Sequence, residues 1–127
     1  MFTHVRVGST DPVASLAFYD ATFAALGVPG QHHEGIHGMY GTPETGLFMV
    51  GPAADGEPAC PANGGTIGFT AADPASVDAW HKAGLANGGT CEGPPGPRPY
   101  GQKPMYGAYM RDPVGNKLCA FFIDTSA

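Results

Sequence analysis

Two histidines, His33 and His37, stand at a spacing that could bind zinc. The run His33-Glu34-Gly35-Ile36-His37 matches the H-E-x-x-H pattern, in which two histidines one helical turn apart hold the metal and the glutamate activates water. Glycines before, inside and after the run disfavour a helix, and in one extended strand the two histidines would lie about 13 Å apart. We therefore predict a His-rich surface turn that, with His32, collects metal ions.

The cysteines offer a second kind of chemistry, as thiolate ligands or nucleophiles. Cys60, Cys91 and Cys119 are odd in number and form no C-x-x-C pair, so the sequence does not indicate a disulfide framework. We expect reduced thiols in a cytoplasmic protein.

Composition limits the partners. The chain has 127 residues, 43% hydrophobic and 10% aromatic, with 20 glycines and 13 prolines; this is enough for one compact, turn-rich domain. Six Lys and Arg against 11 Asp and Glu give a formal charge of −5 without any basic run, which excludes the electrostatic footprint of nucleic-acid binding. No apolar stretch approaches the length of about 20 residues that a membrane helix needs. A small molecule is the expected partner, with neither nucleic acid nor membrane.

The elements that position these residues occur twice along the chain. Asp11-Pro12 and Asp73-Pro74 each cap and begin a helix, and each helix follows a strand and precedes three more. Proline-rich residues 93–100 are expected to form a stiff loop. The fold class is therefore α+β, a single domain over residues 1–127 built from βαβββ repeats at about 1–51 and 65–123 with a linker at 52–64. The expected strands are 2–9, three short runs within 30–51, 65–70, 90–93, 105–111 and 117–122.

This tandem plan resembles the vicinal oxygen chelate superfamily, which holds glyoxalase I, bleomycin-resistance proteins, thiol transferases and extradiol dioxygenases. The opening Thr3-His4-Val5 and the turn Asp112-Pro113-Val114-Gly115-Asn116 before the last strand carry the resemblance. It implies a curled, barrel-like mixed sheet around a cavity with helices outside. Because family members commonly pair, it also implies a homodimer.

The resemblance further implies four metal-ligand positions, on the first and last strand of each repeat. They fall on His4, about Phe48, Thr66 and Cys119. Only His4 is the usual ligand, since Phe48 cannot bind a metal and Thr66 is a poor donor. The site is expected to hold either no cofactor or a divalent metal (Zn, Mn, Fe or Ni) bound by His4 and Cys119.

The alternation of side chains along each strand predicts further residues of the cavity lining. Arg6 shares a face with His4, and Lys117 and Phe121 share a face with Cys119. Tyr106 and Tyr109 fall on opposite faces of one strand, and Tyr106 is the one we assign to the cavity. Ordinary structural roles stay open for each residue: a core histidine, a buried thiol, an arginine at the rim. The predicted ligand-binding set is His4, Arg6, Phe48, Thr66, Arg98, Tyr100, Tyr106, Cys119 and Phe121.

Two functions follow as hypotheses. In the first, the protein binds a small organic molecule in its cavity without metal, as sequestering bleomycin-resistance proteins do. In the second, it is a metal-dependent lyase, isomerase or thiol transferase that uses a non-standard His4 and Cys119 site. If it is an enzyme, the resemblance implies a glyoxalase-like lyase or a related dioxygenase or transferase.

Overall fold

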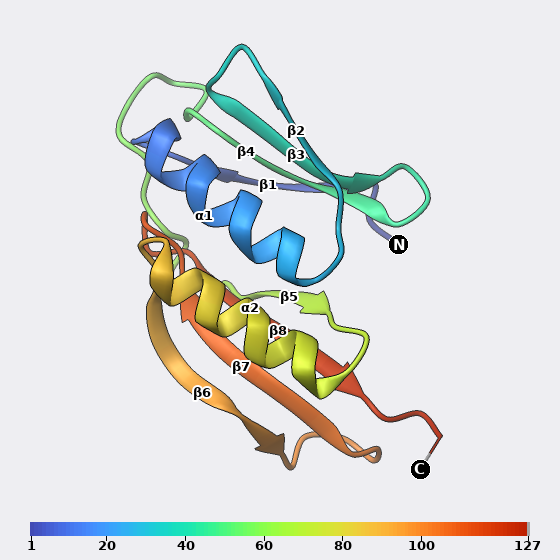
Figure 1. The fold of residues 1–127 in the computed structure, drawn as a ribbon. Helices are drawn as coiled ribbons and strands as arrows, with labels where there is room; N and C mark the ends of the chain where they lie inside the picture. The colour runs from blue at the N-terminus through green and yellow to red at the C-terminus, as the bar shows by residue number, and fades with distance from the viewer. Residues whose placement is uncertain (127) are drawn as a thin grey trace.

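The computed structural model, which describes residues 1–126, contains two consecutive βαβββ modules (Figure 1). This confirms the predicted α+β fold and its tandem plan. The first module consists of β1 (His4–Gly8), α1 (Pro12–Ala25), β2 (Gly30–His33), β3 (His37–Thr42) and β4 (Gly46–Gly51). The second consists of β5 (Ile67–Thr70), α2 (Pro74–Ala86), β6 (Thr90–Arg98), β7 (Met105–Arg111) and β8 (Lys117–Ile123).

Each module forms its own four-stranded mixed sheet. The strand orders are β1-β4-β3-β2 and β5-β8-β7-β6, so the first and last strands of each module lie side by side and run parallel. The remaining neighbours are antiparallel. β1 and β5 are therefore edge strands, each with one unpaired side.

Both helices begin where the sequence predicts. The Ala14 amide donates to the Asp11 carboxylate at 3.2 Å, and the Ser76 amide donates to Asp73 at 2.7 Å. These carboxylates satisfy amides that the first helical turn leaves unpaired. The bonds from Ser76 also lower the pKa of Asp73.

The two helices pack against each other between the sheets (Figure 1). Tyr19 and Phe23 of α1 lie against Tyr40 and Phe48 of the first sheet, and Phe69 of β5 joins the same ring cluster at 4.9 Å from Phe23. Since each sheet turns one face to the helices, its other face points outward. The two outward faces open in opposite directions, and the sheets do not close into one barrel within the chain.

Polar contacts also join the modules. Asp112, in the turn between β7 and β8, is buried, and its carboxylate accepts the amides of Val114, Gly115 and Asn116. The hydroxyl of Tyr19, on α1, donates to the same carboxylate. Burial, followed by the charge and hydrogen bond of Asp112, raises the pKa of Tyr19.

The proline-rich segment differs from its prediction. Strand β6 continues through Pro94, Pro95 and Pro97 to Arg98 instead of ending in a loop at residue 93. The prolines are tolerated because β6 is an edge strand, where one side of the backbone needs no partner. Register shifts on either side of Gly93 absorb the irregularity.

Neither helix within residues 1–126 is long and apolar enough to span a membrane.

Candidate functional site

The outward face of the second sheet gathers side chains around Tyr109. Tyr109 pairs with Cys119 across β7 and β8, and its ring meets the edge of Phe121 with centroids 5.6 Å apart. Two cations lie over the same ring: the Lys117 ammonium at 5.4 Å and the Arg98 guanidinium at 6.0 Å from the centroid. We call Arg98, Tyr109, Lys117, Cys119 and Phe121 the Tyr109 cluster.

Glycines make room for this cluster. A Cβ atom at Gly107 would lie 2.4 Å from the Phe121 ring, and one at Gly68 would lie 3.1 Å from the sulfur of Cys119. Gly93 leaves the space taken by the Arg98 guanidinium, 3.3 Å from where its Cβ would stand. These glycines therefore let the cluster's side chains lie directly against the backbone, and larger residues at the glycine positions would displace those side chains.

Burial and charge set the protonation of the cluster. Burial raises the pKa of Cys119, and the positive charge of Lys117 opposes that rise. Burial also raises the pKa of Tyr109, with contributions from Cys119 and Tyr100. The thiol and the phenol are therefore both neutral at physiological pH, and the charges of the cluster are those of Lys117 and Arg98.

The outward face of the first sheet holds a second group of polar and sulfur-containing residues. His4 and Arg6 lie on it, with Met39 and Met49 paired across β3 and β4. The Arg6 guanidinium donates to the Pro52 carbonyl at 2.7 Å. A pocket of about 450 Å³ on this face is lined by Arg6, Gln31, His32, His33, His37, Gly38, Met39, Met49 and Val50.

The H-E-x-x-H run forms a hairpin, which agrees with the predicted turn. His33 and His37 face each other directly across β2 and β3, with ring centroids 6.2 Å apart, whereas one extended strand would hold them about 13 Å apart. The chain reverses between them, so rise along one strand does not set their separation. Metal collection by this pair stays a prediction.

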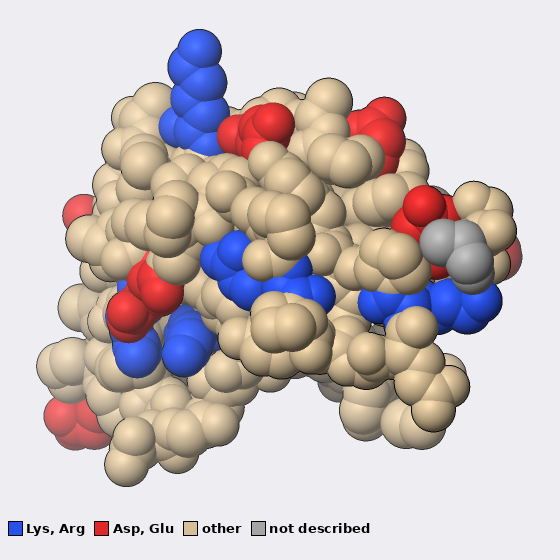
Figure 2. All heavy atoms as spheres, turned by 90° about the horizontal axis from the view of Figure 1, so that it is seen from below, with Lys and Arg blue, Asp and Glu red and all other residues tan. Residues whose placement is uncertain are grey.

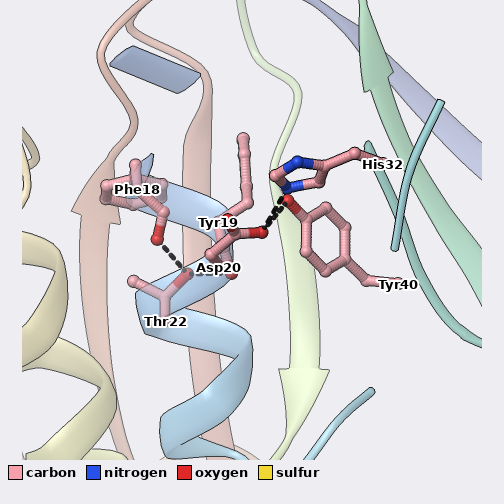
Figure 3. Close-up of polar contacts among 6 residues, drawn as sticks. All are labelled: Phe18, Tyr19, Asp20, Thr22, His32 and Tyr40. Carbon is pink, nitrogen blue, oxygen red and sulfur yellow. Dashed lines mark hydrogen bonds and ion pairs between the residues drawn. The ribbon is translucent and has the colours of Figure 1, made fainter. Parts of the chain in front are cut away.

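His32 does not join this pair. Its Nε2 lies 2.9 Å from the Asp20 carboxylate on α1, which also accepts the Tyr40 hydroxyl at 2.8 Å (Figure 3). Burial, and then the hydrogen bond to Asp20, raises the pKa of Tyr40. These contacts tie α1 to the first sheet, so His32 points to the helix side while His33 points away from it.

The structure corrects the placement of two predicted site residues. Phe48 lies in the aromatic core. The β1–β4 register pairs His4 with Leu47 and Val5 with Phe48, so Phe48 shares the inward face of Val5. Leu47 and Met49, not Phe48, therefore share the face of His4. Tyr106 also faces the helices, where its hydroxyl donates to Asp78 of α2 at 2.7 Å.

The remaining predicted residues divide between the two outward faces. His4 and Arg6 lie on the first sheet. Arg98, Cys119 and Phe121 are brought together by the second sheet, with Tyr100 beside them after β6 and Thr66 directly before β5. Sequence reasoning misses Tyr109 as the centre of this group. Alternation places Tyr106 and Tyr109 on opposite faces of β7, but only the pairing of Tyr109 with Cys119 across β7 and β8 shows which of the two joins the group.

A cleft of about 690 Å³ lies between the edge strands of the two sheets. Its lining comes from β1 and β4 on one side, β5 on the other, and the end of α1. Met1 and Phe2 stand beside it, and the side chain of Phe2 is 71% exposed.

The tandem βαβββ fold and the outward sheet faces define a class of protein with known relatives. The sequence profile of the Glyoxalase/Bleomycin resistance protein/Dioxygenase superfamily matches residues 2–120, so this chain belongs to that superfamily. This confirms the resemblance seen in the sequence. No curated protein matches the chain.

Solved structures agree with this assignment. A glyoxalase/bleomycin resistance protein from Albidiferax ferrireducens T118 is 46% identical, with a TM-score of 0.89 over 96% of this chain and 98% of that one. A lactoylglutathione lyase from Agrobacterium tumefaciens is 24% identical, with a TM-score of 0.63 over 96% and 92%. A glyoxalase-related enzyme from Fulvimarina pelagi is 19% identical, with a TM-score of 0.74 over 96% and 87%. The last two show a shared fold only.

His4 and Cys119 have no metal-binding side chain directly across from them in their sheets. Leu47 pairs with His4 and Gly68 pairs with Cys119, and neither Leu47 nor Gly68 carries a donor atom in its side chain. His4 and Cys119 also lie on faces that open in opposite directions. Across residues 1–126, no three His, Cys, Asp or Glu side chains gather in a way that could hold a metal ion.

Proposed function

We propose that this protein binds a small organic molecule against the outward face of its second sheet, without the divalent metal of the superfamily. The Tyr109 cluster is the observation that carries the proposal. It joins an aromatic pair, two cations and a neutral thiol over glycine backbone, and an apolar surface with a few convergent polar groups is the usual composition of a ligand site.

A second copy of the chain completes this site. The outward faces of the two sheets cannot cover one another within one chain, because they open in opposite directions. The unpaired edges of β1 and β5 and the exposed Phe2 give a partner copy apolar surface to bury. The homodimer would set the first-sheet face of one copy, with His4 and Arg6, near the Tyr109 cluster of the other.

The test is a thermal-shift screen of a small-molecule library on protein treated with a chelator, followed by calorimetric titration of the compounds that stabilise it. Phe121→Ala should weaken these compounds by about tenfold, because it removes one ring of the aromatic pair. Tyr106→Phe is the matched control, since it changes an aromatic residue of the same sheet on the opposite face. It should leave affinity within about twofold.

Two results would contradict the proposal. Binding that appears only after Zn, Mn, Fe or Ni is added, and that disappears in both His4→Ala and Cys119→Ser, would favour the metal-dependent enzyme. Equal loss of affinity in Phe121→Ala and Tyr106→Phe would place the ligand elsewhere. The proposal predicts instead that His4→Ala changes affinity without changing metal content.

A further inference from the structure

The Tyr109 cluster also indicates the chemical class of the ligand, an inference that rests on the proposed function. We infer that the ligand is an organic anion, with a carboxylate or similar group on a flat aromatic or conjugated body. Lys117 and Arg98 would bind the anionic group, and Tyr109 and Phe121 would contact the body.

Within residues 1–126, neither Arg98 nor Lys117 forms an ion pair with a carboxylate. The Arg98 guanidinium donates there to backbone carbonyls alone, those of Pro94 at 2.7 Å, Gly96 at 3.0 Å and Pro97 at 3.3 Å. These bonds fix its position over Tyr109 but leave its charge uncompensated. Lys117 forms no hydrogen bond or ion pair with any carboxylate within residues 1–126, and its contact is with the Tyr109 ring.

The pKa of the Glu92 carboxyl responds to Lys117, but this carboxylate already has another partner. Glu92 forms an ion pair with Arg111, and that bond is the main reason the pKa of Glu92 is lowered, with Lys117 contributing least. Arg111 lies on the same outward face, paired with Lys117 across β7 and β8. Three cations therefore stand on this face, and within residues 1–126 the only carboxylate that forms an ion pair with any of them is that of Glu92.

The positive charge of this face contrasts with the rest of the molecule. The chain carries a formal charge of −5, yet three of its six Lys and Arg residues are Arg98, Arg111 and Lys117. Figure 2, seen from the side of the second sheet, shows Lys and Arg side chains in a band across this face, with most Asp and Glu toward its edge. A positive surface on an acidic protein selects anions and repels cations.

The aromatic side chains of the cluster suit a flat ligand body. Tyr109 and Phe121 meet edge to face with their planes at 77°, so they form two walls of a corner. Gly107 and Gly68 let the Phe121 ring and the Cys119 sulfur lie close against the backbone. A flat ring stacks on such walls with little loss of side-chain entropy, and aromatic contacts favour it over a flexible chain. The neutral Cys119 thiol adds no charge that would repel the anion.

Three naphthalene compounds of one shape test the inference: naphthoate (anion), naphthamide (neutral) and naphthylmethylammonium (cation). Calorimetric titration of the full-length protein should rank naphthoate at least about tenfold tighter than naphthamide, with naphthylmethylammonium weakest. Raising the salt concentration should weaken naphthoate and leave naphthamide unchanged.

Substitutions then test whether Lys117 and Arg98 cause the preference for the anion. Lys117→Met should reduce naphthoate affinity by about fivefold to tenfold and leave naphthamide within twofold, and Lys117→Arg should restore most of the loss. Arg98→Leu should act in the same direction. Lys82→Met, on the exposed side of α2, removes the same charge away from the site and should have no effect.

The possible results distinguish a failure of the anion inference from a failure of the proposed function. If naphthamide or naphthylmethylammonium binds as tightly as naphthoate, the anion inference is wrong and the proposed site still stands. A Lys82→Met loss equal to that of Lys117→Met would attribute the preference to net charge and also overturn the inference. If none of the three compounds binds, the anion inference is wrong, and the library screen decides separately whether the proposed function stands.

Discussion

The three cysteines show how position decides the chemistry of one residue type. Cys60 and Cys91 are exposed, whereas Cys119 is buried on β8 beside Tyr109. Burial raises the pKa of Cys119 and holds its thiol neutral, which makes it a poor nucleophile and a poor metal ligand. Cys91 differs again, because its sulfur lies 3.2 Å from Nε2 of His81.

A thiol-reactive disulfide such as a dithiobis-nitrobenzoate measures this difference. In folded protein at pH 8, Cys119 should react at least about tenfold more slowly than Cys60 and Cys91, because only thiolate attacks and access is blocked. Variants that retain a single cysteine assign each rate, and in denaturant the three rates should converge. A fast reaction of Cys119 in the folded protein would show that its burial does not persist in solution.

At the scale of the elements, helix α2 carries a buried histidine, His81. His81 is 8% exposed, and burial lowers its pKa below 6.5, with Asp78 opposing the shift. The folded protein therefore keeps His81 neutral at a pH where the unfolded chain already binds the proton. Its contribution to stability is complete above about pH 6.5 and declines as the pH falls from there through the lowered pKa.

The free energy of unfolding should therefore fall between pH 7 and pH 5, and fall less in His81→Gln. Urea unfolding at half-unit steps of pH gives both curves, and the pH slope, not the absolute stability, is the readout. His33→Gln is the control, because the side chain of His33 is 77% exposed on the other module. If the slopes of wild type and His81→Gln coincide, His81 does not carry the pH dependence of α2 packing.

At the scale of the whole molecule, the arrangement of the modules determines what each sheet face can do. The helices occupy the interior, and the ring cluster around Phe23 and Phe69 holds the modules together. In the homodimer that we propose, each outward face would form one half of a cavity, and the second copy would supply the other half.

Light scattering coupled to size-exclusion chromatography should therefore give twice the chain mass of 13.0 kDa. Phe2→Glu should shift the protein toward monomer, since it places a charge beside the edges of β1 and β5. Val13→Glu makes the same change at a residue that is 79% exposed on α1, away from the cleft, and should remain dimeric. A monomeric wild-type protein at micromolar concentration would contradict the homodimer.

The sequence by itself determined the order of elements, their approximate bounds and the superfamily. Capping residues such as Asp11 and Asp73, helical spacing and glycine punctuation are local signals, and they act through contacts within a few residues. The grouping of Cys119 with Lys117 and Phe121 was equally local, because alternation relates residues of one strand.

Only the tertiary structure decided which of the two faces of each strand points outward and what stands opposite it. Alternation leaves that choice open, and strand register fixes it: Leu47 rather than Phe48 beside His4, and Tyr109 rather than Tyr106 beside Cys119. The same holds for His33 and His37, which a hairpin brings face to face. These contacts are set by burying apolar faces against the helices, a condition that depends on the whole chain at once.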